Sequence, residues 1–266
     1  GSFGGSLKSL TATQLGAVAI KGAMDKINLD INLVDEVYMG SVLQAGLGQA
    51  PARQAAIKAG LPISTVCTTI NKVCASGMKS VTFGSQSIQL GQSKVVVSGG
   101  FECMSMTPHY VYMRKPVIYG GSSLIDGIYN DGLLDAYDNV PMGLCAEKTV
   151  KDYSISREAQ DNYCELSYKR VKEADFSKEI APVEIENPKT KKLQSLSVDE
   201  EPGKFIAEKF RTLKPAFDKN GTITAANSSK INDGACSLII ADEEYAKSRG
   251  LTILARIKGY QDAEVA

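Results

Sequence analysis

The chain is organised around one segment, Val66-Cys67-Thr68-Thr69-Ile70-Asn71-Lys72-Val73-Cys74-Ala75-Ser76-Gly77-Met78-Lys79. Its β-branched beginning is typical of a strand, and the pattern that follows Cys74 is typical of a helix that starts at Ser76 and ends near Gly91. Unpaired backbone N–H groups and the positive end of the helix dipole converge where a helix begins, and both favour a thiolate over a thiol. The sequence therefore predicts a nucleophilic cysteine, Cys74, at a strand-to-helix elbow.

A buried, inert thiol is the alternative interpretation of Cys74, because free cysteine is among the most commonly buried residue types. The small neighbours Ala75, Ser76 and Gly77 leave room for a substrate, and Lys72 and Lys79 bring positive charge close in sequence. Both features favour the nucleophile, but on spacing alone both interpretations stay open.

The bulk composition excludes several classes of function. The 266 residues contain 30 basic and 30 acidic side chains, so net charge gives no support to a nucleic-acid binder. No apolar run approaches the roughly 18 residues of a membrane span, so no membrane association is expected. The six cysteines form no C-x-x-C pair and the only histidine is His109, which argues against a zinc site and for a reducing compartment.

Alternating strand and helix patterns predict an α/β fold in which a β-α-β unit pairs its strands in parallel. Helices are expected after a cap at Thr11 or Thr13, from Pro51 to Gly60, and over 143–153, 156–174 and 242–249, with strands over 36–43, 66–70, 94–98, 237–240 and 253–259. We expect a core made of residues 1–102 and 220–266, interrupted by an insertion over 103–219.

The segment from Asn187 to Lys219 carries eight basic and five acidic residues, a local excess of three positive charges. A solvated surface loop explains this composition, and so does a landing site for a phosphorylated ligand. The composition alone does not separate the two.

Residues 71–79, Asn-Lys-Val-Cys-Ala-Ser-Gly-Met-Lys, resemble the active-cysteine motif of the thiolases, in particular the biosynthetic-type acetyl-CoA acetyltransferases. Further blocks follow in the order of that family and cover essentially the whole chain; they are residues 37–44, 48–54, 98–105, 131–133, 142–143, 222–229 and 232–235. Several independent blocks in one order make the resemblance specific.

The resemblance implies the amino-terminal half of a thiolase, with a mixed sheet that has helices on both faces and an α/β loop domain that covers coenzyme A. It implies a Claisen condensation of acetyl-CoA to acetoacetyl-CoA, and the reverse thiolysis, through an acyl group on Cys74. No cofactor is expected to be tightly bound, since coenzyme A enters as the thioester substrate.

The resemblance also assigns ligand contacts, residue by residue. The residues implied to contact coenzyme A are Lys204, Phe205, Ile206 and Lys209 at the adenosine phosphate end, Tyr168 and Phe217 in the pocket wall, and Ser229 and Met142 along the pantetheine arm. Tyr168 with the backbone of Ala225, Ala226 and Ser228 resembles the potassium site of mitochondrial acetoacetyl-CoA thiolases. Apart from the resemblance, the residue types of Tyr168, Phe217 and Met142 are equally typical of ordinary core or helix-face positions.

This sequence departs from the family pattern at several points. Lys204 stands where relatives often have arginine, and Pro141 stands where a histidine usually precedes the Met-Gly pair. The family's Gly-His-Pro, Cys-x-Gly-Gly-Gly and Asn-Glu-Ala-Phe blocks, which belong to the carboxy-terminal half, do not occur, and His109 matches none of them.

From these departures we expect a fragment without the carboxy-terminal thiolase domain that does not turn over alone. The resemblance further implies a homo-oligomer, a dimer or tetramer, and a mitochondrial matrix location in preference to the cytosol. A non-catalytic acyl-CoA-binding module is the alternative function, and a cysteine hydrolase is a third, disfavoured by the lack of a second histidine.

Overall fold

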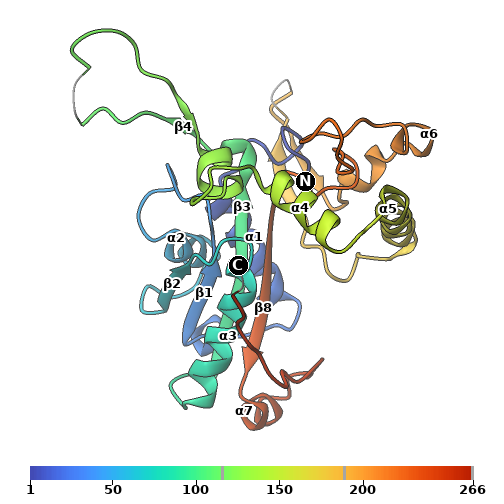
Figure 1. Ribbon diagram of the computed structural model, residues 1–266. Coiled ribbons are helices and arrows are strands. Elements are labelled where there is room, and N and C mark those ends of the chain that lie inside the picture. Colours follow the sequence, from blue (N-terminus) through green and yellow to red (C-terminus); the bar gives the residue numbers. More distant parts are fainter. Residues whose placement is uncertain (115–116, 188–189, 265–266) are drawn as a thin grey trace. The chain divides into compact units, whose positions relative to one another are not determined.

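The computed structural model describes residues 1–114, 117–187 and 190–264, and the chain divides into two compact units (Figure 1). The first, called here the sheet unit, comprises Leu10–Cys103 and Gly234–Ala266; the second, the loop unit, comprises Gly1–Ser9 and Met104–Asp233. The insertion expected from the sequence covers residues 103–219. The loop unit of the structure ends later, at Asp233, and also includes the first nine residues.

The sheet unit is built on a four-stranded sheet in the order β2-β1-β3-β8. Its strands are β1 (Glu36–Gly40), β2 (Val66–Ile70), β3 (Val95–Cys103) and β8 (Asp233–Ala241). β1 pairs in parallel with both β2 and β3, so that Gly40 lies opposite Ile70 and Gly100. Because paired parallel strands end at one edge, residues that follow β1 and β2 meet where β3 reaches Gly100.

Helices cover both faces of this sheet, as predicted. The helices of the sheet unit are α1 (Ala12–Asp25), α2 (Pro51–Lys58), α3 (Ser76–Gln89), α7 (Glu243–Ser248) and the 3₁₀ turn η1 (Ile31–Leu33). Phe101 of β3 lies against α1, where a Cβ on Gly16 would meet its ring at 2.5 Å. Ser98 lies three positions before Phe101 on β3, so its side chain points to the other face, and its hydroxyl donates to the carbonyl of Ser80 on α3 at 3.1 Å. Alternation along β3 therefore places α1 and α3 on opposite faces.

The helix ends follow the sequence signals. Thr11 caps α1 and forms a capping box with Gln14. Gly60, Gly91 and Gly250 have positive φ just after α2, α3 and α7, the conformation that glycine adopts most readily.

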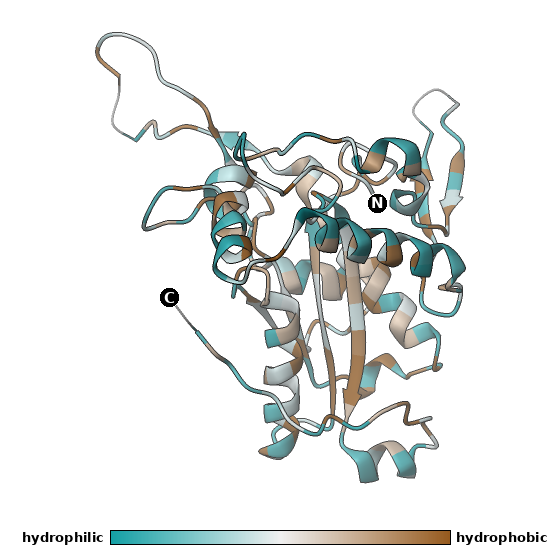
Figure 2. Ribbon diagram, turned by 45° about the vertical axis from the view of Figure 1, so that its right-hand side comes forward, coloured by the Kyte–Doolittle hydropathy of each residue, from teal (hydrophilic) through white to brown (hydrophobic). Residues whose placement is uncertain are grey.

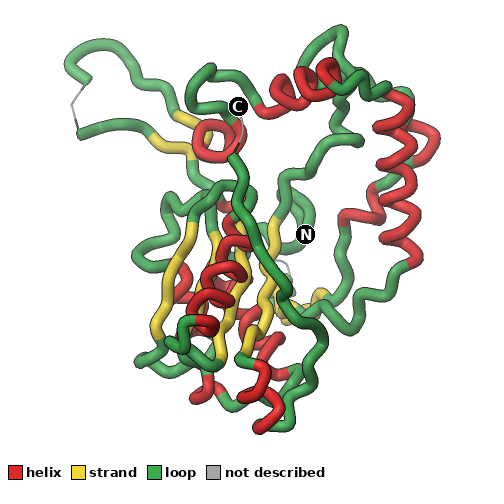
Figure 3. The backbone as a smooth tube through the Cα atoms, turned by 60° about the horizontal axis from the view of Figure 1, so that its bottom comes forward, coloured by secondary structure: helices red, strands yellow, loops and turns green. Residues whose placement is uncertain are grey.

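Two strand predictions differ from the structure. The strand expected over 36–43 ends at Gly40, because the N–H groups of Val42 and Leu43 donate to the Glu102 carboxylate and not to a neighbouring strand. The strand expected over 253–259 is wrong, since residues 251–264 contain neither helix nor strand (Figure 3). Side chains hold this segment in place of a backbone ladder, with the Tyr260 hydroxyl donating to Gln89 at 2.9 Å.

The loop unit consists of one long helix, α5, and several shorter elements. These are the helices α4 (Met142–Asp152), α5 (Arg157–Glu173) and α6 (Ala207–Phe210), the 3₁₀ turns η2 (Met104–Met106) and η4 (Glu201–Lys204), the π-helical turn η3 (Tyr129–Leu133), and the antiparallel pairs β4 (His109–Tyr110) with β5 (Ile125–Asp126) and β6 (Val183–Glu186) with β7 (Leu193–Leu196). Ser156 caps α5 as predicted. α5 is mostly hydrophilic (Figure 2), and Asp161 is its buried residue. Within the described residues, no helix has the length and apolar character needed to cross a membrane.

Candidate active site

Cys74 lies in the elbow between β2 and α3, and its side chain is exposed. Ser76 ties the elbow together, because its hydroxyl accepts from the Lys72 N–H at 2.8 Å and donates to the Val73 carbonyl. The N–H groups of Ala75 and Ser76 add turn hydrogen bonds to the carbonyls of Lys72 and Val73, at 3.1 Å and 3.0 Å. The thiol therefore stands on a short turn that several hydrogen bonds fix, one residue before the Ala75 cap of α3.

Glycine lets α3 approach the sheet closely at this elbow. A Cβ on Gly40, the last residue of β1, would lie 2.4 Å from the carbonyl carbon of Ser76 and 2.6 Å from the nitrogen of Gly77. Contacts under 3.0 Å are not tolerated between a Cβ and backbone, so only glycine fits at Gly40. The first turn of α3, and with it Cys74, is thus seated directly on the end of β1.

Lys72 and Lys79 both contact the carboxylate of Asp262. The two ammonium groups hold the pKa of Asp262 at about 2, and Asp262 in turn raises the pKa of Lys72. A cavity of about 200 Å³ lies between α3 and the segment 257–262, and Ala75, Met78 and Tyr260 are among the residues that line it. In this structure the positive charge expected near Cys74 is therefore paired with a carboxylate of the same unit.

All of the predicted coenzyme A and potassium residues lie in the loop unit, whereas Cys74 lies in the sheet unit. Tyr168 of α5 stacks on Phe205 with ring centroids 4.5 Å apart, and both rings meet Phe210 edge-on. The Lys172 ammonium lies 5.1 Å from the Phe205 ring centre. A cavity of about 240 Å³ opens beside Tyr168. The structure thus brings together Tyr168 and Phe205, two of the predicted residues, and adds Phe210 and Lys172, which the sequence did not single out.

The other predicted contacts are spread over the loop unit. Met142 begins α4, and a Cβ on its neighbour Gly143 would overlap the Phe217 ring at 2.2 Å, so Phe217 packs on the start of that helix. Lys204 lies 3.5 Å from the Glu201 carboxylate. Ile206 precedes α6 as its cap residue, Lys209 lies within α6, and Ser229 is exposed.

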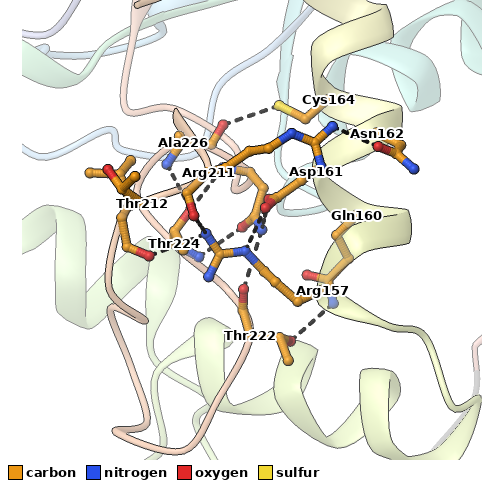
Figure 4. A network of polar contacts seen from close by, with 12 residues as sticks. Arg157, Gln160, Asp161, Asn162, Cys164, Arg211, Thr212, Thr222, Thr224 and Ala226 are labelled. Atoms are coloured by element: carbon orange, nitrogen blue, oxygen red, sulfur yellow. Dashed lines mark hydrogen bonds and ion pairs between the residues drawn. The ribbon is translucent and has the colours of Figure 1, made fainter. Parts of the chain in front are cut away.

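The turn over 222–228 is held to α5 by a network that sequence reasoning missed (Figure 4). Asp161, 3 % exposed, accepts from the Arg157 Nε at 2.8 Å and from the Asn227 Nδ2 at 3.0 Å. Gln160 of the same helix donates to the Thr222 hydroxyl at 2.9 Å. A buried carboxylate is costly unless it is paired, so Asp161 needs both partners and fixes the turn. The charged-residue pattern of α5 gave no signal for this role.

Two of the backbone carbonyl groups predicted to bind potassium, those of Ala225 and Ala226, already have donors in the structure. The Lys230 ammonium donates to the Ala225 carbonyl at 2.5 Å, and the Cys164 thiol donates to the Ala226 carbonyl at 3.2 Å. Burial raises the pKa of the Cys164 thiol, and the nearby Lys230 charge opposes that shift. Ser228 turns its hydroxyl to the Thr224 carbonyl at 2.7 Å. As folded, this turn fits a cation only in part, because an ammonium group already contacts one of the expected ligands.

Comparison with known proteins places these features in a family. The family description that matches residues 1–244 is "Thiolase, N-terminal domain". Acetyl-CoA acetyltransferase 2 of Arabidopsis thaliana is 51 % identical over 269 residues, which cover 99 % of this chain and 67 % of the relative. The acetyl-CoA acetyltransferase of Schizosaccharomyces pombe is 47 % identical, with 99 % and 68 % covered. One relative, from Gibberella zeae, is named as a cytosolic acetyl-CoA acetyltransferase and is 46 % identical.

A solved structure agrees with these sequence matches. The Acat5 thiolase from Ascaris suum, in complex with coenzyme A, superposes with a TM-score of 0.86 at 44 % identity, over 94 % of this chain and 65 % of that chain. This chain spans about two thirds of the length of the relatives that it matches. The chain belongs to the thiolase family of acyltransferases and contains the family's N-terminal domain.

Proposed function

We propose that this chain supplies the acyl-accepting cysteine of an acetyl-CoA acetyltransferase, and that Cys74 is that residue. The observation that carries the proposal is the exposed thiol in the elbow that begins α3, in a chain about half identical to proteins named acetyl-CoA acetyltransferase. The 266-residue sequence resembles the short-chain, acetoacetyl-specific thiolases around this cysteine, which favours acetyl-CoA and acetoacetyl-CoA as substrates.

The first step that we propose is a thioester exchange. The Cys74 sulfur, as thiolate, attacks the acetyl carbonyl of acetyl-CoA, a new carbon–sulfur bond forms, and the bond to the coenzyme A sulfur breaks. Coenzyme A leaves as a thiolate that takes up a proton. The α-carbon of a second acetyl-CoA then displaces Cys74 to give acetoacetyl-CoA, and thiolysis runs the same bonds in reverse. That second step needs a base near the α-carbon and an oxyanion site.

For coenzyme A binding we propose the residues of the loop unit assigned by family resemblance. The proposed contacts are Lys204, Phe205, Ile206 and Lys209 for the adenosine phosphate end, Tyr168 and Phe217 for the pocket wall, and Met142 and Ser229 for the pantetheine arm. Support comes from the stack of Tyr168 on Phe205, from the cavity of about 240 Å³ that Tyr168 lines together with the acidic Asp199 and Glu201, and from the named coenzyme A complex of the solved relative. A stacked aromatic pair next to lysines suits an adenine ring with its phosphates.

Potassium, assembly and compartment remain predictions. A potassium ion at Tyr168, Ala225, Ala226 and Ser228 competes with the Lys230 ammonium for the Ala225 carbonyl. A homo-oligomer and a mitochondrial location rest on the resemblance alone, and one relative is named as cytosolic. Since residues 1–266 contain one histidine, His109, in a context unlike the family's catalytic block, we further propose that this stretch alone does not complete the cycle.

Radiolabelled acetyl-CoA tests the role of Cys74. Protein that contains this chain is incubated with the label, digested, and examined for acid-stable label on the peptide with Cys74. We expect Cys74→Ala to abolish the label and Cys236→Ser, which removes the other exposed thiol, to leave it unchanged. Label that persists in Cys74→Ala refutes the proposed nucleophile. Coenzyme A binding without any label on Cys74 in the unmodified protein would favour the non-catalytic binding module.

A further inference from the structure

Glu102 lies at the end of β3, and its carboxylate reaches across to the segment that follows β1. One oxygen accepts from the Val42 N–H at 2.8 Å and the other accepts from the Leu43 N–H at 3.1 Å. Burial raises the pKa of Glu102, since taking a carboxylate out of water disfavours its charged form. Burying a neutral side chain at this position would cost less free energy than burying a carboxylate. The two N–H groups that the carboxylate accepts therefore point to a positioning role for its charge.

The segment held by Glu102 contacts the catalytic elbow through Asn71. The Asn71 side-chain nitrogen donates to the Val42 carbonyl at 3.4 Å, and its side-chain oxygen accepts from the Val73 N–H at 2.9 Å. Val73 is the residue before Cys74. A continuous set of hydrogen bonds therefore runs from Glu102 through Val42 and Asn71 to the backbone that carries the nucleophile.

Val73 has a backbone conformation that needs such support. Its φ of 48° lies in the left-handed region, which costs roughly 1–2 kcal/mol for an ordinary residue and is unusual for a β-branched one. Such a conformation persists only where the surroundings fix it. Ser76 fixes the elbow from the helix side, and Asn71 fixes it from the strand side.

We propose that Glu102 is a positioning residue for Cys74, which acts through Val42 and Asn71 to hold Val73 in the left-handed conformation. The role rests on the proposed function only in that Cys74 is the acyl acceptor. Replacing the carboxylate by an amide of the same shape, Glu102→Gln, turns an NH₂ group toward one of the two N–H donors. One of these partly buried N–H groups then loses its partner, and the segment that carries Val42 loosens.

Hydrogen exchange tests this chain of contacts without depending on activity. In Glu102→Gln we expect the Val73 amide to exchange about 10-fold faster, although three hydrogen bonds separate it from the substitution, and in Asn71→Ala we expect at least as large an increase. Glu36→Gln is the matched control. Glu36 also accepts from neighbouring side chains, the hydroxyls of Tyr38, Ser87 and Ser93, but it lies at the opposite end of β1. That variant should leave Val73 exchange unchanged.

Acetyl labelling of Cys74 then links the position to the chemistry. We expect Glu102→Gln to lower the maximal labelling rate about 10-fold at an unchanged half-saturating acetyl-CoA concentration. The double variant with Asn71→Ala should lose little more than either single one, since both act through the same contacts. If the losses in labelling rate of the two single variants multiply in the double variant, Glu102 and Asn71 act independently, which contradicts the proposal that they act through the same hydrogen bonds.

The outcomes separate this proposal from the proposed function. Label that survives Cys74→Ala refutes the nucleophile and leaves the exchange measurement to decide the hydrogen-bond chain. Val73 exchange within twofold of the unmodified protein in a folded Glu102→Gln overturns the positioning role, whatever the labelling shows. If Glu102→Gln does not fold, Glu102→Asp, which withdraws the carboxylate by one methylene, is judged by the same criterion.

Discussion

Replacing Gly40 by alanine should displace the nucleophile without touching it. Gly40 ends β1, and the new methyl group would lie 2.4 Å from the Ser76 carbonyl carbon, 2.6 Å from the Gly77 nitrogen and 2.8 Å from the Ser76 Cβ. Both nearest atoms belong to the backbone, so no side-chain rotation relieves the overlap. Because ordinary contact begins near 3.4 Å, the first turn of α3 must move about 1 Å away from the sheet.

The size of this displacement sets two expected effects. Overpacking of this kind costs about 1–3 kcal/mol, and at about 2–4 °C per kcal/mol the midpoint of thermal unfolding should fall by about 2–12 °C. A misplacement of about 1 Å in a reacting group can lower a rate about 100-fold. We therefore expect acetyl labelling of Cys74 to fall much further than stability does.

Calorimetry and acetyl labelling measure the two effects, with Gly77→Ala as the matched control. Gly77 belongs to the same first turn, but the atom nearest to a new Cβ lies at 3.8 Å, an ordinary contact. Alanine there should keep or raise the unfolding midpoint, because glycine within a helix costs about 1 kcal/mol relative to alanine. If Gly40→Ala unfolds and labels like the unmodified protein while Gly77→Ala behaves as expected, the close approach of α3 to β1 is refuted.

Three further predictions concern buried charge and the turn on α5. Asp161→Ala leaves Arg157 without its carboxylate, and because breaking a buried pair costs about 3–5 kcal/mol, denaturant unfolding should show a loss of that order, less what the partly exposed Arg157 recovers from water. Lys230→Met removes the ammonium donor of the Ala225 carbonyl, so its thermal midpoint should become higher in potassium than in sodium, and equal midpoints would contradict a cation role at this turn. Burial raises the pKa of Glu102 in the folded protein above 4.5. The stabilisation that this raised pKa provides is therefore present below about pH 4.5 and is lost as pH rises through the raised pKa. The difference in free energy of unfolding between Glu102→Gln and the unmodified protein should change over that interval and stay constant at higher pH.

Local patterns predicted most of the sheet unit because its signals are close in sequence. The Thr11 cap, Pro51 at the start of α2 and the glycine that follows each of α2, α3 and α7 all lie within a few residues of the element that they end or begin. The elbow at Cys74 was visible for the same reason, since the strand, the turn and the start of α3 occupy fourteen consecutive residues.

Features that depend on distant contacts were not predictable. β1 was expected to continue to Leu43, but Glu102, 60 residues from Val42, takes the N–H groups that a longer strand would have used. The strand expected over 253–259 has an apolar pattern typical of a strand, yet pattern alone does not supply a neighbour for its backbone. In the sequence Asp161 is one of several charged residues of α5, and its partner Asn227 lies 66 residues further along the chain.

The parallel register explains why the nucleophile needs support from such distant residues. Gly40, Ile70 and Gly100 lie side by side, so the segments that follow β1 and β2 leave the sheet at the same edge, near Glu102 of β3. Each segment has backbone groups that no strand pairs, and the N–H of a buried residue such as Leu43 costs about 1–3 kcal/mol when it is left unpaired. The side chains of Glu102 and Asn71 accept three of these N–H groups, from Val42, Leu43 and Val73. The contacts that satisfy the end of the sheet are therefore the ones that hold the strained residue next to Cys74, and a substitution that disturbs one should disturb the other.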